Sequence, residues 1–460
     1  MKSNQEIIKA IYDYRDKMEK FNFTPCQKLT DFKLLPSAAD RYGVVIMKDE
    51  KVYRGIYPKS KDMFIRLYNT GILQTLMNEG FIPIFSVSDF YTDDYPLLIE
   101  VEKLYITHAQ EYTYSMIKQE AKLKLRLLEI LTEFGYTLID GHTGNTTFKK
   151  GNPVFFDLGS FVQSPIRSGA ADQEIWLYNI VPLIFLSCGK FMSARGIYYG
   201  FPNPWLAPYV APKASKEVKD TINEFCKLFN VDNEQKEKLK NFQPLTSDEL
   251  DILFPMDNFA TNTEEKSKYT YLQNFQNTSD DISIKIINKI CDSYSNPTIM
   301  HIGCSTGWFL NQCVQSGKCK SMYGLDCNEF LLDYAVNHVQ GADFIFCNAI
   351  IGGAISIPNV DVVYVSGMTY DVLANNKFDI TTVLTRIKRY VSNSLYIEFF
   401  PYGKNKKQST DKTIPNWYSL EWFETHLAKF FNIVSKETLE TIEINGEQKP
   451  SRVLYETKIS

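Results

Sequence analysis

Residues 298–326 read TIMHIGCSTGWFLNQCVQSGKCKSMYGLD. An apolar segment, 298–302, leads into a turn that contains Gly303 and Gly307, and a helical pattern follows the turn. Glycines at this place let the backbone approach a ligand closely, and the start of a helix presents unpaired amides to a polar group. A second apolar segment ends at Asp326, whose carboxylate is placed to accept hydrogen bonds from both hydroxyls of a ribose. This stretch therefore predicts a strand, a ligand-binding turn, a helix and a second strand.

The residues that follow continue the alternation of strand and helix. Candidate strands cover 298–302, 321–325, 344–347, 360–365 and 394–399, with helical patterns between them. Such alternation is typical of a mostly parallel sheet with helices on both faces. The third strand ends near Cys347 and Asn348, where the edge of an adenine would lie, and the fourth ends before Gly367, over the reacting end of the same ligand.

The segment HIGCSTGWF resembles the first motif of class I S-adenosylmethionine-dependent methyltransferases, h-D-h-G-C-x-x-G. The resemblance implies a Rossmann-like class I methyltransferase domain with S-adenosyl-L-methionine as its cofactor. His301 departs from the motif, because the family often has an acid there that supports the methionine end of the ligand. Another Rossmann-like ligand is the alternative, since many such folds carry two glycines at this turn. The resemblance implies that the cofactor is bound by Gly303, Cys304, Gly307, Asp326, Asn348 and Gly367.

Two acids are catalytic candidates on the acceptor side of this site. Residues 367–373, GMTYDVL, resemble a segment of related methyltransferases, with Asp371 where a histidine usually stands. Asp371 can act as a general base for a hydroxyl acceptor, although a carboxylate with a pKa of about 4 is a weak base, and an acceptor that is already an anion needs only positioning. The segment SLYIEFFP resembles the family's I-E-F strand and adds Glu398. The alternatives are a helix N-cap for Asp371 and a solvated carboxylate at a strand end for Glu398.

A second constellation lies in residues 136–161, YTLIDGHTGNTTFKKGNPVFFDLGSF. A short strand leads to Asp140, Asn145 follows five positions later, and another strand leads to Asp157. Phosphoryl transfer needs a carboxylate that orients the attacking hydroxyl, and an amide and a carboxylate that hold Mg²⁺ against the nucleotide phosphates. The spacing equals that of the kinase catalytic loop, D-x-x-x-x-N, and Asp157 stands where the magnesium-binding D-F-G would stand. We expect Asp140 to be catalytic and Asn145 and Asp157 to hold the metal.

This region resembles the kinase-like superfamily that includes aminoglycoside and choline phosphotransferases, which implies ATP and Mg²⁺ as ligands. The segment PLLIEVEKL, with Glu100, resembles the strand that enters the hinge, where backbone groups meet adenine. Lys48, Arg54 and Arg66 compete for contact with the phosphates, and Arg54 in KVYRGIY is our choice. No G-x-G-x-x-G loop is present. The alternative is a pseudokinase in which Asp140 and Asn145 form local turns and Asp157 caps one.

More narrowly, residues 111–161 resemble the N-terminal half of a bacterial family of nodulation-protein-like methyltransferases, and WLYNIVPLIFL, 176–186, resembles the helix that follows there. The O-antigen chain-terminating enzymes, which join a kinase to a methyltransferase in the opposite order, are a precedent in kind. The resemblances imply a kinase-like domain over 1–230, a polar and partly helical connector over 231–282, and the methyltransferase over 283–460.

The implied function is methyl transfer to a bacterial surface glycan or a related polyhydroxylated or phosphorylated small acceptor, with ATP-dependent phosphorylation before methylation. The alternative is a methyltransferase whose N-terminal domain is a pseudokinase that binds the acceptor or regulates the enzyme.

Composition is consistent with this two-part organisation. A chain of 460 residues exceeds one compact core, and a net charge of -4 argues against a nucleic-acid partner. No apolar run reaches the roughly 20 residues of a transmembrane helix, and the amphipathic N-terminus lacks the apolar core of a signal peptide, which favours the cytoplasm. The nine cysteines show no zinc spacing, so we interpret them as buried thiols.

Overall fold

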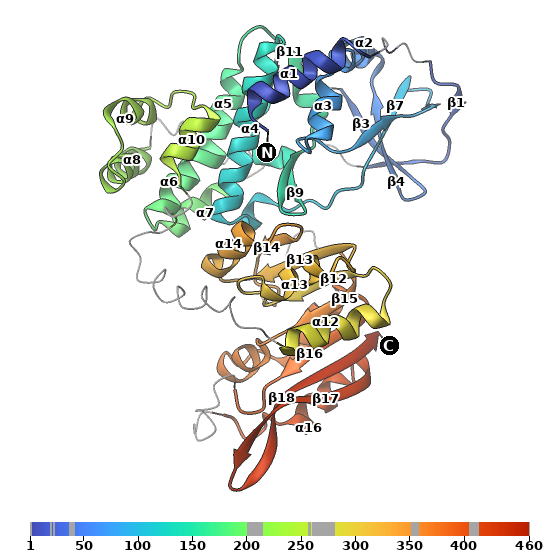
Figure 1. The fold of residues 1–460 in the computed structure, drawn as a ribbon, viewed down its shortest axis with the longest axis vertical. Coiled ribbons are helices and arrows are strands. Elements are labelled where there is room, and N and C mark those ends of the chain that lie inside the picture. Colours follow the sequence, from blue (N-terminus) through green and yellow to red (C-terminus); the bar gives the residue numbers. More distant parts are fainter. Residues whose placement is uncertain are drawn as a thin grey trace. The chain divides into compact units, whose positions relative to one another are not determined.

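The computed structural model folds into two compact units, which are drawn from blue to red along the chain in Figure 1. Unit 1 comprises residues 1–109, 116–148 and 152–262, and unit 2 comprises 110–115, 149–151 and 263–460. Within the described ranges, no helix combines the length and the apolar character needed to cross a bilayer. The described residues are 2–18, 21, 24–35, 42–199, 215–255, 259, 281–350, 358–403 and 414–459.

Unit 1 begins with helix α1 (Asn4–Arg15) and an antiparallel five-stranded sheet of order β2-β3-β4-β7-β5. Its strands are β2 (Lys33–Leu35), β3 (Gly43–Lys48), β4 (Lys51–Ile56), β7 (Leu97–Val101) and β5 (Phe85–Val87). β3 and β4 form a hairpin whose turn is made by Asp49 and Glu50, with φ of 49° and 67°. Two left-handed residues give the turn whose twist matches that of the flanking strands. Helices α2 (Lys61–Tyr68) and α3 (Ile72–Asn78) lie between β4 and β5 in the chain.

The rest of unit 1 is mainly helical. Its longest described helix is α4 (Tyr114–Glu133), whose leucine face, including Leu127 and Leu131, is buried. Gly135, with φ of 73°, follows the helix. The chain continues through β8 (Tyr136–Leu138), β9 (Thr146–Lys149), β10 (Asn152–Phe155), β11 (Phe161–Gln163), α5 (Gly169–Ile175), a π-helical turn (Trp176–Ile180), α6 (Val181–Ser187), α7 (Phe191–Tyr199), α8 (Lys216–Leu228), α9 (Asn233–Lys240) and α10 (Ser247–Leu253). β8 pairs with β11 and β9 with β10.

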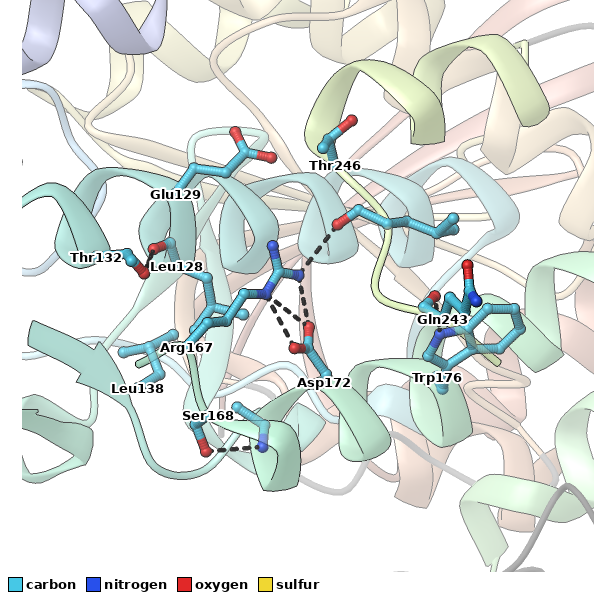
Figure 2. A network of polar contacts seen from close by, with 12 residues as sticks. Leu128, Glu129, Thr132, Leu138, Arg167, Ser168, Asp172, Trp176, Gln243 and Thr246 are labelled. Atoms are coloured by element: carbon cyan, nitrogen blue, oxygen red, sulfur yellow. Dashed lines mark hydrogen bonds and ion pairs between the residues drawn. The ribbon is translucent and has the colours of Figure 1, made fainter. Parts of the chain in front are cut away.

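Much of the predicted connector belongs to unit 1. α9 and α10 are joined by a segment that hydrogen bonds attach to α5 and its continuation (Figure 2). Arg167 binds the Asp172 carboxylate at 2.9 Å through Nε and the Leu245 carbonyl at 3.0 Å through Nη2. The Trp176 indole donates to the Gln243 carbonyl at 2.9 Å. Unit 1 therefore extends to residue 262 rather than 230, and most of the remaining connector lies outside the described residues.

Unit 2 is built on a seven-stranded sheet of order β14-β13-β12-β15-β16-β18-β17. The strands are β12 (Thr298–Ile302), β13 (Ser321–Asp326), β14 (Asp343–Phe346), β15 (Val360–Val365), β16 (Val391–Phe399), β17 (Phe431–Ile444) and β18 (Glu447–Ile459). The first five in the chain run parallel, and β18 is antiparallel to both of its neighbours. The predicted mostly parallel, Rossmann-like sheet is confirmed, whereas the long hairpin of β17 and β18 was not predicted.

The connections of this sheet change direction at β12. The helices are α12 (Asp281–Ser293), α13 (Trp308–Ser316), α14 (Glu329–His338), α15 (Ile380–Lys388) and α16 (Leu420–Leu427). The chain passes from β12 to β13 and β14 on one side, and then returns to β15 on the other side. At such a switch point the connections diverge, and doubly wound proteins bind ligands at the carboxyl ends of the strands there. The residues that follow β12, β13, β14 and β15 therefore lie at the edge where a ligand is expected.

Candidate functional sites

The predicted glycine turn lies at the switch point of the unit 2 sheet. Gly303 and Gly307 both have φ of 78°, in the left-handed region that favours glycine. The amides of Gly303 and Cys304 both donate to the Leu325 carbonyl, at 2.8 and 3.1 Å. Between them and α13, Ser305 takes φ of 52°, which costs a non-glycine residue about 1 kcal/mol or more. The turn is thus a strained connection held against the end of β13.

Asp326 joins this turn to the next one. Its Oδ2 accepts from the Ser305 amide at 2.7 Å, and its Oδ1 accepts from the Asn328 amide at 2.8 Å. The Cys347 amide donates to the Asp326 carbonyl at 3.0 Å, which brings Asn348 to the same edge. The structure therefore brings together the predicted turn, the predicted ribose acid and the end of β14.

The two glycines are also required by packing. A Cβ atom on Gly307 would lie 3.0 Å from the Cβ of Ala335 on α14 and 3.3 Å from the Phe344 ring. A Cβ atom on Gly303 would lie 3.1 Å from the Ser366 carbonyl oxygen, just before Gly367, whose φ is 63°. Close approach of the turn to α14 and to the end of β15 therefore accounts for both glycines without any ligand.

His301 is a buried, neutral side chain beneath the turn. Its Nε2 lies 2.6 Å from the Ser366 hydroxyl, and its ring stacks on Tyr364 with centroids 4.8 Å apart. Burial lowers the pKa of His301 to about 3. Nδ1 has no hydrogen-bond partner among the described residues. An uncharged ring therefore occupies the position where the resembling family often has an acid.

Glu398 is fully buried, which rules out the alternative of a solvated carboxylate at a strand end. Its Oε1 accepts from the Tyr364 hydroxyl at 2.7 Å and from Arg452 Nη2 on β18 at 2.6 Å. Oε2 has no partner among the described residues. Tyr364 also stacks on His301, so a connected group of buried side chains extends from β12 to β18. Its members are His301, Tyr364, Glu398 and Arg452.

Asp371 lies in a different environment. It is exposed, in the π-helical turn Tyr370–Asn375, and its Oδ1 accepts from Nδ2 of the Asn375 side chain at 2.9 Å. The N-cap position of this turn belongs to Thr369, so the alternative of an N-cap for Asp371 is wrong. Thr369 donates to the Glu398 carbonyl at 2.9 Å and connects the turn to the end of β16. Of the two predicted acids, Asp371 is the one that a soluble acceptor can reach in this structure.

In unit 1, hydrogen bonds join the two loops that carry the predicted phosphoryl-transfer residues. The Asp140 amide donates to Ser160 Oγ at 3.0 Å, and the Phe156 amide donates to the Asn145 carbonyl at 2.9 Å. Asp157 Oδ1 accepts from the Gly159 amide at 3.0 Å, so this side chain does cap a turn. The same oxygen also accepts from Arg54 Nη2 on β4 at 3.0 Å. The structure thus pairs our chosen cation with the predicted metal ligand.

Glu100 does not join this group through its side chain. In the pairing of β4 with β7, Glu100 lies opposite Tyr53, whereas Arg54 lies opposite Ile99. Successive residues of a strand point to opposite faces, so the side chains of Glu100 and Arg54 lie on different faces of the sheet. Glu100 pairs instead with Lys51 at 3.0 Å. Only the backbone of Glu100 is left for the predicted contact with adenine.

Several side chains that support the loop after Asp140 were not predicted. The Gly141 amide donates to Glu174 Oε2 at 2.6 Å, and burial raises the pKa of Glu174 to about 6. On α4, Lys124 and Glu120 form an ion pair of 2.7 Å, and neither side chain has any exposed area. These acids and bases sit in helical patterns without any local motif, so no signal in the sequence marked them.

Comparisons with known proteins give structural similarity alone. No protein-family model and no curated protein matches the chain. Similar solved structures include a TehB-like SAM-dependent methyltransferase from Corynebacterium glutamicum (15% identity, 43% of this chain and 98% of that chain, TM-score 0.33). Others are SAM-dependent methyltransferases from Archaeoglobus fulgidus (17%, 42% and 99%, 0.31) and Clostridium acetobutylicum (11%, 43% and 98%, 0.33). Values this low carry no functional argument.

Gly141→Ala should distort the loop after Asp140. The added Cβ would lie 2.4 Å from the Ala171 carbonyl oxygen in α5, and such overpacking costs about 1 to 3 kcal/mol. The matched control is Gly169→Ala in the same helix, where no atom lies within 4 Å of the new Cβ. Urea unfolding with hydrogen exchange of peptides from 136–145 measures both variants. Equal protection in the two variants would contradict this account of Gly141.

Arg452→Met should destabilise unit 2 by about 3 to 5 kcal/mol, because it leaves the buried Glu398 carboxylate without its cation. Lys449→Met on the same strand is the control, since Lys449 is 39% exposed and its partner Glu447 is 74% exposed, and exposed pairs contribute less than about 1 kcal/mol. The double variant Glu398→Leu with Arg452→Met should recover most of the loss in urea unfolding. A single variant no worse than Lys449→Met would refute the role of the pair.

Proposed function

We propose that unit 2 is a methyltransferase domain that binds S-adenosyl-L-methionine at the carboxyl ends of β12, β13, β14 and β15. The observation that carries the proposal is the Asp326 carboxylate, which holds the Gly303–Gly307 turn through the Ser305 amide at 2.7 Å. A glycine turn and an acid at the end of the next strand are the pair of features that a nucleoside ligand requires at a switch point. The resemblance of HIGCSTGWF to the methyltransferase motif supports the choice of cofactor.

Each predicted contact has a definite place in this proposal. The backbone at Gly303, Cys304 and Gly307 and the first turn of α13 would contact the methionine part, and Asp326 would accept hydrogen bonds from the ribose hydroxyls. Asn348 would lie at the adenine edge and Gly367 beneath the reacting end. His301, being neutral, would support the methionine end by hydrogen bonding rather than by charge. The bound cofactor supplies an electrophilic methyl group on its sulfonium.

On the acceptor side we assign the two acids to different roles. Asp371 is exposed in the turn after β15, and it would orient the acceptor hydroxyl and take its proton. Glu398 is buried and paired with Arg452, so it would act by positioning Tyr364 and the end of β16. A small polyhydroxylated or phosphorylated acceptor, such as a surface-glycan precursor, would present a hydroxyl group that this exposed carboxylate can orient.

S-adenosylhomocysteine should bind the full chain in calorimetry, and Asp326→Asn should weaken binding at least about tenfold, because an amide presents one acceptor oxygen where the carboxylate presents two. The control is Glu421→Gln, an exposed acid in the first turn of α16. Hydrogen exchange of the 303–307 peptide in the free protein shows whether the variant keeps its turn. Absence of binding by the unaltered chain would overturn the proposal.

A second proposal concerns unit 1, which we infer to be a kinase-like domain that binds Mg²⁺ and ATP. The observation in its favour is the contact between Arg54 and Asp157 at 3.0 Å, beside the loop that carries Asn145. An amide oxygen and a carboxylate are hard oxygen donors of the kind that Mg²⁺ takes together with water and substrate phosphates. Asp140 would accept the proton of the attacking hydroxyl, Arg54 would contact the phosphates and the Glu100 backbone would meet the adenine.

The two proposals together describe an enzyme that phosphorylates an acceptor and then methylates it. The alternative is a unit 1 without catalytic activity that binds the acceptor or regulates the methyltransferase. The hydrogen bond from the Gly159 amide to Asp157 agrees with this alternative, in which Asp157 only caps a turn. The ion pair of Asp157 with Arg54 is not needed for such a turn and therefore favours the binding site.

Magnesium-ATP should bind the full chain, and binding should be lost in Asp157→Asn and weakened at least about tenfold in Arg54→Met, since each removes a charge that faces the phosphates or the metal. Lys51→Met is the control, because Lys51 lies on the same strand, is 57% exposed and pairs with Glu100 rather than with Asp157. Calorimetry with and without Mg²⁺ measures all four proteins. If the unaltered chain does not bind ATP, the kinase proposal is wrong and the pseudokinase alternative is favoured.

A further inference from the structure

A cavity of about 240 Å³ lies in the helical part of unit 1, between the π-helical turn Trp176–Ile180 with α6, α7 and α8. The residues of its walls recur at helical spacing, so each helix contributes one face. The walls include Leu177, Val181, Phe185, Gly196, Ile197 and Val218. No lining residue belongs to the loops that carry Asp140, Asn145 and Asp157. We call this space the α6–α8 cavity.

Pro182 interrupts the regular hydrogen bonding of the helix that leads into α6. Proline has no amide hydrogen, and its ring collides with the carbonyl four residues earlier, which here is that of Tyr178. The helix takes a π turn at this place, and the Tyr178 carbonyl accepts a hydrogen bond from the Tyr198 hydroxyl on α7 at 2.7 Å. This contact ties α7 to the wide turn. Single π turns inside helices are frequent at functional sites.

The base of the α6–α8 cavity is apolar and its rim is exposed. The base is formed by side chains that are at most 6% exposed, namely Val181, Phe185, Ile197 and Val218. Met192 at the rim is 83% exposed. A cavity of roughly 150 Å³ with aliphatic and aromatic walls stays dry and binds benzene. The α6–α8 cavity is larger, so the apolar part of a small organic molecule fits into it.

Gly196 keeps part of this space open. It lies inside α7, where glycine is less favourable than alanine by about 1 kcal/mol. No atom lies within 4 Å of the position that a Cβ would take, so packing does not require glycine here, as it does at Gly307. Gly196 lines the cavity, and a side chain at this position would occupy space that is open in this structure.

A carboxylate stands at the rim without a side-chain counter-ion. Glu217 is exposed in the first turn of α8, and it accepts from the Ser193 hydroxyl on α7 at 2.7 Å. Ser193 is neutral, and in the part of the chain that the structure describes no cation forms an ion pair with Glu217. Glu224 on the same helix, by contrast, pairs with Lys190 at 2.8 Å. The rim therefore presents a negative charge beside an apolar space.

We propose that the α6–α8 cavity binds a small organic cation, whose apolar part lies among Val181, Phe185 and Ile197 and whose ammonium group meets Glu217. A concave apolar space with a few polar groups at one end is the usual form of a small-molecule site. A charge-assisted hydrogen bond to the carboxylate selects a cation over a neutral or anionic molecule of the same size. The cavity shares no residue with the Mg²⁺ and ATP site proposed above, so either proposal can fail while the other holds.

The first test compares three probes of equal chain length, n-hexylamine, 1-hexanol and hexanoate, in NMR titrations of the full chain at pH 7. The amine is protonated at this pH, as lysine is. It should bind at least about tenfold more tightly than the alcohol, and hexanoate should bind most weakly. Glu217→Gln should lower the affinity for the amine to that for the alcohol, whereas the control Glu224→Gln, which does not line the cavity, should change neither. Equal affinities for amine and alcohol, or no binding of the amine by the unaltered chain, would overturn the proposal.

The second test fills the cavity. Gly196→Leu should abolish binding of n-hexylamine without lowering the urea midpoint, because leucine is a better helix former than glycine. The matched control is Gly169→Leu in α5, where a Cβ also has no neighbour within 4 Å but does not line the cavity. Unchanged binding in Gly196→Leu would place the amine elsewhere and refute the assignment.

The third test locates the amine in the unaltered chain, so it does not depend on the folding of a variant. In a protein with ¹³C-labelled methionine methyl groups, n-hexylamine should shift the signal of Met192 at the rim. The signal is identified by its loss in Met192→Leu. Met116, which is 1% exposed in α4 and does not line the cavity, is the internal control and should not shift. A Met192 signal that stays in place at saturating amine would contradict the proposal.

Discussion

The candidate site of unit 2 depends on one carboxylate that two turns share. Asp326 ends β13, and its two oxygens accept from the backbone amides of Ser305 and Asn328. Hydrogen bonds from backbone amides to a charged acceptor contribute about 1.5 to 3 kcal/mol each, which is enough to offset the left-handed conformation of Ser305. The same interaction fixes the glycine turn before any ligand arrives, so binding does not have to order it. An acid at this strand end therefore serves the fold and would also serve the proposed ligand.

Buried ion pairs lie beneath both candidate sites, and they differ from the acids at the surface. Glu398 with Arg452 in unit 2 and Glu120 with Lys124 in unit 1 have little or no exposed area. Burying a charge costs several kcal/mol, and only a close partner with further hydrogen bonds offsets this cost. Such pairs hold strands and helices in one arrangement, and the loss of either partner would leave a buried charge unpaired. Exposed Asp371 carries no such constraint and is free to meet an acceptor.

The sequence predicted those elements whose pattern is local. The buried strands of unit 2 are short apolar runs, and the 303–307 turn and the hairpin at Asp49 and Glu50 carry their own signals. β17 and β18 were not predicted because charged residues recur along both strands, although Asn445–Gly446, both with positive φ, is a hairpin signal. α9 and α10 were assigned to a connector because few of their residues are buried, among them Leu239 and Leu250.

The ion pairs could not be predicted because their members lie far apart in the chain. Arg452 and Glu398 are 54 positions apart, and Arg54 and Asp157 are 103 positions apart. Strand order and register bring such partners together, and neither follows from spacing in one sequence. Arg54 was chosen as the phosphate contact because of a resemblance, and the structure shows that it pairs with Asp157. Nothing in the sequence indicated that Glu398 pairs with Arg452.

The exposure of the Arg54–Asp157 pair bears on what unit 1 does. The side chain of Arg54 is 9% exposed, and Asp157 supplies the counter-charge of its guanidinium at 3.0 Å. A magnesium-bound phosphate would bring a cation to Asp157 and an anion to Arg54, so both partners could exchange without leaving a charge unpaired. In the pair of Glu398 with Arg452, by contrast, the side chain of the acid is only 1% exposed and is closed to a soluble ligand. Asp157 remains 24% exposed, which keeps the carboxylate accessible to such an exchange and favours a binding site over a closed turn.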